Sequence, residues 1–432
     1  MTKSVPTGKF RRTRMAGGAI LKTGGHHLTH IARRPFLNSE ARSIEKESLD
    51  EKTAQILFNA LSQLKGTALK LAQMLSMDSH LLPESIRKQL EKSYHQVTPL
   101  GRPLIRKIFL QEFGTPAENI FSTFEQQAFA AASLGQVHKA TADNHHVLAV
   151  KLQYPGIDIT INNDLQIMRM LIKRTPHAKL LLSSLDEIGH RLHEEIDYRQ
   201  EADNTNWFRE RLQLEDIVIP AVHSDFSTKR ILTTTLLPGE HLDQWLSNTP
   251  DQDQRNHFAQ RLYDLFVNSF YGLNALHADP NPGNYLFAGD GSLGLIDFGC
   301  VRHFSKNFVA LIPILINAYM QNDAEVILHT YQKLGLEVSD LRASELETFY
   351  SETLEPFGAW LSEPFRAGRF DFGSRSSPYT KEGMNIFKQL SRVSKVDDIA
   401  NEFIYFDRTL FGLYQIFERM EAQVNMEHKW LI

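Results

Sequence analysis

The residues with the clearest chemical potential form the pattern H-x-D-x-x-x-x-N, followed by D-F-G. His277 and Asp279 begin the first motif, Asn284 lies five positions after Asp279, and Asp297 begins the second motif after a short hydrophobic run. Phosphoryl transfer needs one carboxylate to orient the attacking hydroxyl, plus an amide and a second carboxylate to hold Mg²⁺ on the phosphates. The two motifs therefore predict a Mg²⁺-nucleotide site, with Asp279 as the catalytic residue and Asn284 and Asp297 as metal ligands.

The D-F-G triplet alone has a second interpretation, a turn at the end of a strand, because three-residue motifs often match by chance. The occurrence of D-F-G at this sequence spacing after the H-x-D-x-x-x-x-N motif favours the nucleotide site over the turn. Cys300 follows the triplet directly. It is either an accessible thiol near the nucleotide or a small buried hydrophobic residue.

A nucleotide site also needs a cation for the α- and β-phosphates, held by a carboxylate from a helix. Lys151 ends the run Leu148–Lys151, which is close to the V-A-I-K strand pattern. The alternative is a surface lysine on an edge strand. Because of the match to the V-A-I-K pattern, we assign Lys151 as both a catalytic and a nucleotide-binding residue.

An acidic stretch follows Lys151 in the chain, with four carboxylates between His193 and Ala202. We expect Asp197 and Glu201 to share one helix face, where two like charges cost a few tenths of a kcal/mol unless a cation or metal lies beside them. This pattern favours a Lys–Glu ion pair. The alternative is a solvated acidic face neutralised by arginines 191 and 199.

The chain has no glycine-rich phosphate loop ahead of the lysine strand. Where G-x-G-x-x-G is expected, the sequence reads Ala130-Ala131-Ala132-Ser133-Leu134-Gly135-Gln136. An alanine Cβ blocks close backbone approach and limits positive φ. We therefore expect the phosphates to be held differently from those in the usual kinase.

The composition sets the class of protein. The 432 residues are 42% hydrophobic and 23% charged, which is ordinary for a soluble globular protein of two lobes. The net charge of −4 argues against a nucleic-acid partner. One cysteine excludes an intrachain disulfide and fits a reducing compartment.

The N-terminus is strongly asymmetric in charge. Residues 1–39 contain eight Lys or Arg and no Asp or Glu. An organelle transit peptide, a disordered tail and a segment that contacts anionic lipid headgroups all remain open. No run approaches the ~18 apolar residues that span a bilayer, and we expect a cytoplasmic protein with peripheral membrane contact.

The remaining sequence predicts the elements that position these residues. Helices are expected at Ser48–Leu75, after Pro83, and at Arg106–Phe113, Asp164–Lys173 and Leu185–Gln213; strands are expected at Val137–Ala140, Val147–Leu152, Arg230–Leu237 and Leu293–Ile296. The rest after Pro238-Gly239 reads as helical outside the catalytic stretch.

This order predicts an α+β, bilobal protein-kinase-like fold with an added N-terminal helical extension and a largely helical C-terminal lobe. We expect a basic tail at 1–47, a helical extension at 48–120, an N-lobe with the Ala-rich loop at 121–238, and a C-lobe with the catalytic loop and D-F-G at 239–432. The nucleotide contacts are assigned to Ala130, Ala131, Ala132, Ser133, Gly135, Gln136, Lys151, Leu236 and Leu237.

At roughly residues 50–420 the chain resembles the ABC1/ADCK/UbiB atypical kinase-like family, which supports ubiquinone biosynthesis. The resemblance rests on the Ala-rich loop, on the E-x-D of Glu195 and Asp197, and on the Asp279, Asn284 and Asp297 set. It implies that Glu201 is the partner of Lys151.

The resemblance also implies an N-terminal helix that closes the active site. The family motif K-x-G-Q matches Lys70-Leu71-Ala72-Gln73, with Ala72 in place of glycine. Because they are three residues apart, we expect Lys70 and Gln73 to point from one helix face, and an ion pair of Lys70 with Glu195 would leave little room for a peptide. Since no membrane anchor follows Lys429–Ile432, we expect a soluble or peripheral relative.

The resulting hypothesis is an ATP- and Mg²⁺-dependent atypical kinase or ATPase with weak or no protein-kinase activity, which supports ubiquinone or isoprenoid-lipid metabolism. Its partners would be a nucleotide, an anionic membrane surface, and isoprenoid or quinone-pathway lipids or enzymes. Two alternatives remain. One is a nucleotide-regulated scaffold or lipid-binding chaperone, and the other is a small-molecule phosphotransferase that shares H-x-D-x-x-x-x-N.

Overall fold

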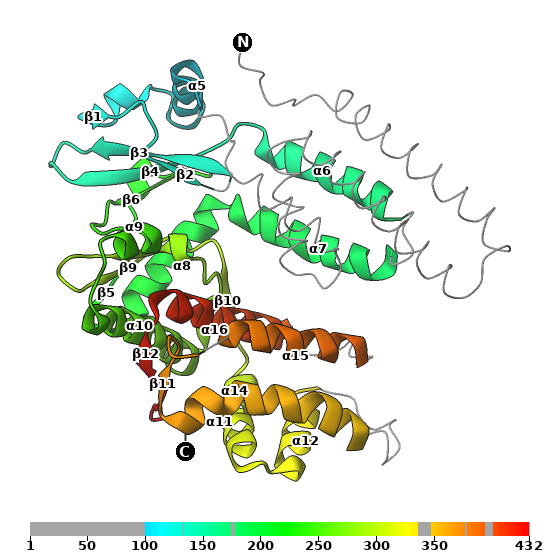
Figure 1. The fold of residues 1–432 in the computed structure, drawn as a ribbon. Helices are drawn as coiled ribbons and strands as arrows, with labels where there is room; N and C mark the ends of the chain where they lie inside the picture. Colours follow the sequence, from blue (N-terminus) through cyan, green and yellow to red (C-terminus); the bar gives the residue numbers. More distant parts are fainter. Residues whose placement is uncertain are drawn as a thin grey trace. The chain divides into compact units, whose positions relative to one another are not determined.

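The computed structural model describes residues 100–132, 134–173, 178–335, 347–375, 378–393 and 401–431. The basic tail, the helices expected before residue 100, and Lys70, Gln73 and Ser133 lie outside these residues. The chain divides into two compact units (Figure 1). One comprises Met1–Gln200 and His223–Thr234, and the other comprises Glu201–Val222 and Thr235–Ile432.

The first unit is built on a five-stranded sheet in the order β1-β3-β4-β6, with β2 paired to β3. The strands are β1 (Thr123–Phe124), β2 (Ala130–Ala132), β3 (Gly135–Thr141), β4 (Val147–Gln153) and β6 (Ile231–Thr235). The expected hairpin is confirmed, because β3 and β4 pair antiparallel around the polar turn, where His145 has φ of 65°. Its register places Val137 opposite Lys151.

Helix α5 (Arg102–Phe113) packs on this sheet through Ile105, Ile108 and Phe109. It ends as expected at Gly114, whose φ of 72° is readily adopted only by glycine. It begins four residues earlier than predicted. Pro103 lies in the first turn, where no intrahelical N–H bond is lost. This unit also contains two short 3₁₀ helices, η2 (Ala117–Asn119) between α5 and β1, and η3 (Ser224–Phe226) just before β6.

Two paired helices follow β4, namely α6 (Ile157–Ile172) and α7 (Ala178–Glu195). The prediction of one helix over Leu185–Gln213 is wrong, because α7 ends at Glu195 and α8 (Tyr198–Arg211) starts afresh. The Asp197 carboxylate accepts the N–H of Gln200 at 3.2 Å. Aspartate favours such a cap over a helix interior. Asp197 and Glu201 therefore do not form one i, i+4 pair on a continuous helix face.

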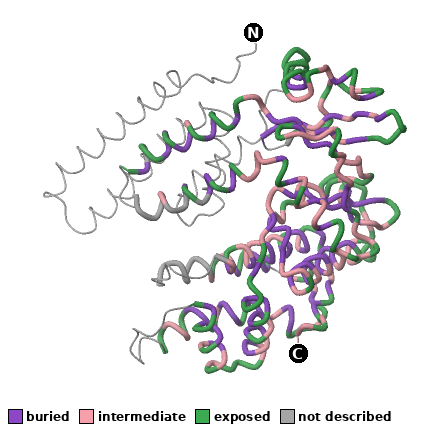
Figure 2. Tube along the Cα trace, turned by 180° about the vertical axis from the view of Figure 1, so that it is seen from behind, coloured by how far each residue is buried: buried purple, intermediate pink, exposed green. Residues whose placement is uncertain are grey.

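The second unit is mainly helical, as expected. Within the described residues it contains most of α8, followed by α9 (Leu242–Ser247), α10 (Gln252–Val267), α11 (Lys306–Gln321), α12 (Ala324–Lys333), α14 (Glu355–Ala367), α15 (Tyr379–Val393) and α16 (Asn401–Met420), with π-helical turns η4 (Asn268–Gly272) and η6 (Tyr350–Leu354). No helix in the described ranges is both long enough and apolar enough to cross a bilayer. Figure 2 colours the buried residues of both units.

Several short strands of this unit were not predicted. They are β5 (Ile217–Val218), β7 (Ala275–His277), β8 (Tyr285–Phe287), β10 (Val301–His303), β11 (Arg369–Asp371) and β12 (Gln423–Asn425); β9 (Leu293–Leu295) matches the expected strand. The sheets are β5-β9-β8, β10-β7 and β11-β12. Strands of two or three residues are too short to show an alternating pattern, so the sequence carries little signal for them.

Candidate nucleotide site

The first half of the site is the loop that follows β7. The 3₁₀ turn η5 (Pro282–Asn284) is capped by Asn281, whose Oδ1 accepts the N–H of Gly283 at 2.9 Å. This turn directs Asn284 back toward Asp279. The Asn284 Nδ2 donates to the main-chain oxygen of Asp279 at 3.1 Å and to its Oδ2 at 2.9 Å. The structure thus brings together two of the three motif residues.

The second half is the D-F-G turn after β9. Asp297 has φ of 63°, a left-handed conformation that Asp adopts more readily than most residues. Its Oδ1 accepts the N–H of Gly299 at 3.3 Å. The N–H of Ile296 donates to the carbonyl of Asn284 at 2.9 Å. The main chain beside Asp297 is therefore joined directly to that of Asn284.

Buried aromatic residues hold this turn in place. Phe298 is 1% exposed and packs edge-on against His277, with ring centroids 5.3 Å apart. It also packs against Phe208 of α8 at 5.4 Å. The carbonyl of Phe298 accepts Nδ2 of Asn204, also from α8, at 3.0 Å. The middle residue of the D-F-G motif therefore anchors the turn in the core of the second unit.

The orientation of the Asn284 amide fits a cation ligand. Both groups that face Nδ2 are acceptors, the carbonyl and the carboxylate of Asp279. The nitrogen must therefore point at Asp279, and the oxygen Oδ1 points elsewhere. A hard divalent cation such as Mg²⁺ prefers oxygen ligands of this kind together with a carboxylate. Asn284 and Asp297 supply both kinds of ligand on adjoining segments.

A basic residue that sequence analysis missed also contacts this site. Arg408 of α16 lies with Nη2 3.5 Å from Oδ1 of Asp279, and the two side chains are 30% and 35% exposed. Arg408 belongs to no motif and lies far from Asp279 in the chain. No spacing rule could have found it.

In the first unit, Lys151 lies on β4 with its Nζ 5.1 Å from the ring centroid of Tyr198. It is half-buried, on the sheet face opposite that of Leu148, Val150 and Leu152, which are fully buried. Tyr198 begins α8, and Glu201 follows three residues later. Residues at that spacing share a helix face, and Glu201 is 3% exposed.

The Ala-rich segment differs from the loop that the sequence predicts. Ala130–Ala132 form strand β2, which pairs antiparallel with β3 so that Ala131 faces Gln136. Gly135 is required at the start of β3. A Cβ there would lie 2.3 Å from the carbonyl oxygen of Leu152 and 2.8 Å from the Tyr198 hydroxyl. The segment is therefore an ordered hairpin strand.

The side chain of Gln136 departs from its expected role as a nucleotide contact. It is 2% exposed and lies on the sheet face opposite Lys151. Its Oε1 accepts the N–H of Leu100 at 2.8 Å. Its Nε2 donates to Nε2 of His138 at 2.6 Å, while Nδ1 of His138 donates to the carbonyl of Glu125 at 2.8 Å. Burial lowers the pKa of His138, which favours this neutral ring.

The family to which this chain belongs is shown by a family model that matches more than half of its residues. Residues 92–331 match the model of the ABC1 atypical kinase-like domain. The chain belongs to the ABC1 atypical kinase-like family. It is therefore an enzyme of the atypical kinase type, in the phosphotransferase and ATPase class. This confirms the family and the kinase-like fold class expected from the sequence.

The similar proteins extend over most of the chain. The mitochondrial atypical kinase COQ8B of Danio rerio is 25% identical, across 99% of this chain and 69% of its own length. The mitochondrial atypical kinase COQ8 of Saccharomyces cerevisiae is 24% identical, across 98% of this chain and 84% of its own length. The structure of Rv3197 with erythromycin from Mycobacterium tuberculosis is similar with a TM-score of 0.59 and 25% identity, and covers 89% of this chain and 96% of that one.

The remaining expected site residues of this ABC1 chain lie as follows. Leu236 and Leu237 come directly after β6, and Leu237 packs beside Gly294 of β9. Glu195 ends α7 and Asp197 caps α8. Cys300 is partly exposed, and its carbonyl accepts the N–H of Ala278 at 2.8 Å.

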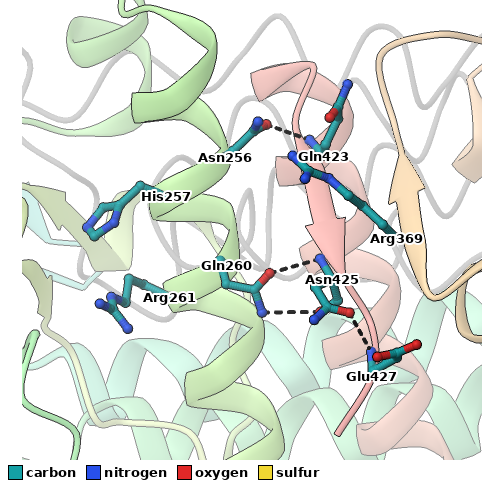
Figure 3. Close-up of a pocket in the computed structure, with 8 residues that line it drawn as sticks. All are labelled: Asn256, His257, Gln260, Arg261, Arg369, Gln423, Asn425 and Glu427. Carbon is teal, nitrogen blue, oxygen red and sulfur yellow. Dashed lines mark hydrogen bonds between the residues drawn. The ribbon is translucent and has the colours of Figure 1, made fainter.

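A polar groove of about 570 Å³ lies between α10 and the β11–β12 ribbon (Figure 3), and none of these motif residues lines it. Its amides already have partners. The Gln260 side chain pairs with both main-chain groups of Asn425, at 2.9 and 3.1 Å, and Asn256 accepts the N–H of Gln423 at 2.7 Å. These bonds pair the main-chain groups at the open edge of β12 with side chains of α10. We therefore interpret the groove as the packing boundary between α10 and β12, which we call the seam.

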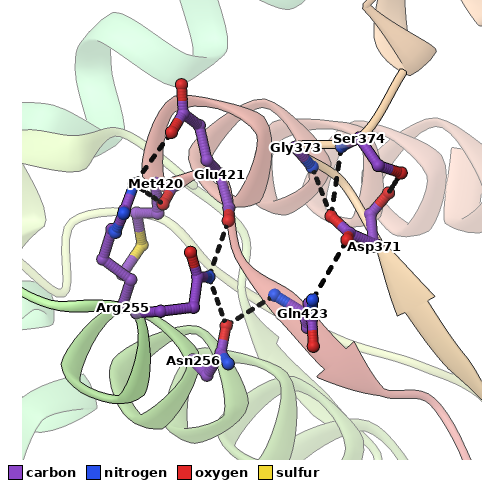
Figure 4. Close-up of polar contacts among 9 residues, drawn as sticks. Arg255, Asn256, Asp371, Gly373, Ser374, Met420, Glu421 and Gln423 are labelled. Atoms are coloured by element: carbon purple, nitrogen blue, oxygen red, sulfur yellow. Dashed lines mark hydrogen bonds and ion pairs between the residues drawn. The ribbon is translucent and has the colours of Figure 1, made fainter.

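Neighbouring contacts close the same seam (Figure 4). Arg255 of α10 pairs with Glu421 at 2.8 Å. On the ribbon, Asp371 accepts the N–H groups of Gly373 and Ser374 at 2.9 and 3.1 Å, and the Gln423 amide donates to Asp371 at 3.0 Å. The seam holds the end of α16 against α10.

Proposed function

We propose that this chain is a Mg²⁺-dependent, ATP-binding atypical kinase or ATPase that supports ubiquinone or isoprenoid-lipid metabolism. The observation that carries the nucleotide assignment is the double hydrogen bond from Asn284 to Asp279, which leaves the Asn284 oxygen for a metal beside the Asp297 turn. The names of the mitochondrial COQ8 relatives support the link to this pathway.

The proposed roles divide among the motif residues. Asp279 orients the attacking hydroxyl or water, and Asn284 and Asp297 hold Mg²⁺. Bound Mg²⁺ would neutralise charge on the phosphates. Lys151, paired with Glu201, binds the α- and β-phosphates. The main chain of the Ala-rich hairpin and Leu236 and Leu237 contact the rest of the nucleotide.

We assign closure over this site to Lys70 and Gln73, with Glu195 and Asp197 as their acidic counterparts. This assignment rests on the family motif in the sequence. A closed site disfavours a folded or extended peptide as the phosphate acceptor. We therefore propose water or a lipid-linked small molecule as the acceptor, with weak or no protein-kinase activity.

We also propose that the protein contacts an anionic membrane as a peripheral protein of the cytoplasm. The eight basic residues of positions 1–39 support this proposal. Each basic residue near an anionic surface contributes about 1 kcal/mol, and this attraction weakens with salt. Membrane contact would place the enzyme beside isoprenoid or quinone-pathway lipids.

ATP turnover, measured with and without anionic liposomes, tests the proposal. The wild-type chain should hydrolyse ATP only with Mg²⁺, and faster on phosphatidylserine-containing vesicles than in their absence. Asp279→Asn should retain nucleotide binding and lose turnover. Nucleotide binding with no turnover under any condition would favour a nucleotide-regulated scaffold instead. No nucleotide binding at all would overturn the proposal.

A further inference from the structure

One face of α16 contacts both motif segments of the second unit. Glu402, Tyr405, Arg408 and Gly412 are spaced by three, three and four residues, so they lie along one side of the helix. Each of them touches the loop that carries Asp279 or the segment that follows D-F-G. No motif in the sequence marks this face.

The contacts to the segment after D-F-G come from the first two residues. The Arg302 guanidinium of β10 stacks 4.5 Å above the Tyr405 ring, and its Nη2 donates to the Tyr405 hydroxyl at 3.3 Å. The Glu402 carboxylate accepts the N–H of Ser305 at 2.6 Å and its hydroxyl at 3.3 Å. Ser305 is the N-cap of α11, so Glu402 holds the start of that helix.

The contacts to the catalytic loop come from the other two residues. Gly412 lies so close to the loop that an added Cβ would stand 2.3 Å from Cγ and 2.6 Å from Cβ of Pro280. Contacts under 3.0 Å force one side to move. Pro280 directly follows Asp279. Glycine at 412 therefore sets how closely α16 approaches the catalytic aspartate.

Arg408 completes this arrangement through the carboxylate itself. The Asp279 Oδ2 accepts Nδ2 of Asn284 at 2.9 Å, and Oδ1 faces the Arg408 guanidinium at 3.5 Å. Each carboxylate oxygen therefore has its own partner. The residue before Asp279 is Ala278, where the H-R-D motif carries arginine. The cation beside the aspartate thus comes from α16.

We infer that Arg408 is a positioning residue for Asp279, and that α16 sets the catalytic loop through Arg408 and Gly412. This inference rests on the proposed function, in which Asp279 orients the phosphoryl acceptor. Arg408 and Asp279 are each about one-third exposed, and ion pairs of this kind contribute little to folding stability. Loss of Arg408 should therefore change turnover rather than stability.

Arg408→Ala tests the carboxylate contact. We expect kcat for ATP to fall by roughly tenfold or more, because small displacements of a positioned group cost large factors in rate. KM for ATP and the melting temperature should change little, since the metal ligands stay in place. Arg408→Lys should recover part of kcat, because lysine restores the charge without the planar fork.

Arg419→Ala is the matched control. Arg419 also lies on α16 and also pairs with an aspartate, Asp243. Its loss should leave kcat at the wild-type value. An unchanged kcat in Arg408→Ala, or an equal fall in Arg419→Ala, would overturn the inference. A wild-type chain with no turnover would overturn the proposed function instead, and the inference with it.

A second pair of variants tests the close approach of α16 at Gly412 to Pro280 of the catalytic loop. Gly412→Ala should lower kcat, because the new Cβ displaces Pro280 and the aspartate beside it. Adding Pro280→Gly removes both side-chain atoms that the Cβ meets, and this double variant should regain turnover relative to Gly412→Ala. The single variant Pro280→Gly supplies the reference rate. Equal rates in Gly412→Ala and the double variant would show that this contact does not position Asp279.

Discussion

The ring of His277 donates a hydrogen bond from Nε2 to the main-chain oxygen of Asp297 at 2.7 Å. This bond joins the first residue of H-x-D to the first residue of D-F-G. The strands β7 and β10 pair beside it, with His277 opposite Val301. Asp297 keeps its left-handed φ of 63° within this frame. The two motifs therefore form one unit through their main chains.

Asp297→Asn should abolish the Mg²⁺-dependent thermal stabilisation by ATP or ADP. Asparagine tolerates the left-handed conformation as well as aspartate does, so the substitution removes the charge and keeps the backbone. Thermal melting with nucleotide, with and without Mg²⁺, measures the effect. Asp290→Asn is the control, because Asp290 is a fully exposed loop carboxylate in the same unit. A wild-type melting shift in Asp297→Asn would contradict metal binding by this residue.

Lys151 and Glu201 should behave as a coupled pair in nucleotide binding. Loss of one member leaves the other charge without its proposed partner. A double-mutant cycle of Lys151→Ala and Glu201→Gln should show a coupling energy on the order of 1 kcal/mol or more.

The matched cycle uses Lys139, which lies on the same sheet face as Lys151 in the β3–β4 register. Lys139→Ala combined with Glu201→Gln should be additive in nucleotide affinity. Additivity of the Lys151 cycle would show that Glu201 is not the partner. Glu194 and Glu195 would then be tested in the same way.

Gly135→Ala should lower the melting temperature and weaken nucleotide binding. The new Cβ would meet the Leu152 carbonyl and the Tyr198 hydroxyl, and such overpacking costs about 1–3 kcal/mol. Displacement of Tyr198 would also disturb Lys151, whose Nζ lies 5.1 Å from its ring centroid. Gly289→Ala is the control, because nothing lies within 4 Å of its added Cβ. Similar melting temperatures for both variants would contradict this packing argument.

Asp407 should make the protein less stable as the pH rises from about 4 to about 7. Burial raises the pKa of its carboxyl from 3.8 to about 7, on the α16 helix near Tyr319 and Tyr331. The folded chain keeps this proton over a range in which the unfolded chain releases it, so the free energy of unfolding falls by up to about 4 kcal/mol. Above pH 7 this contribution levels off.

Asp407→Asn should remove this part of the pH dependence. Denaturant unfolding at pH 5 and pH 8 measures the difference for each chain. The variant should lose less stability between the two values than the wild type does. Parallel losses in both chains would mean that Asp407 ionises in the folded protein much as it does in the unfolded chain.

The sequence by itself determined the features that depend on neighbouring residues. The hairpin of β3 and β4 follows from alternating apolar residues around a polar turn. The end of α5 follows from Gly114, which adopts a left-handed conformation at little cost. The spacing of Asp279 and Asn284 is local too, because one capped turn brings the amide back to the carboxylate. Short-range geometry of this kind is encoded in a few adjacent residues.

Only the tertiary structure decided the features that depend on packing between distant segments. From the sequence, Asp197 could lie inside a helix or cap one. In the structure α7 and α8 are separate helices, and the Gln153 side chain donates to the carbonyl of Ile196, between the two helices, at 2.7 Å. Gln136 could have faced either side of its sheet until Leu100 and His138 supplied partners on one side. Arg408 reaches Asp279 only because Gly412 lets α16 approach the loop. Such contacts follow from how surfaces fit together, and no periodicity or spacing along the chain records that fit.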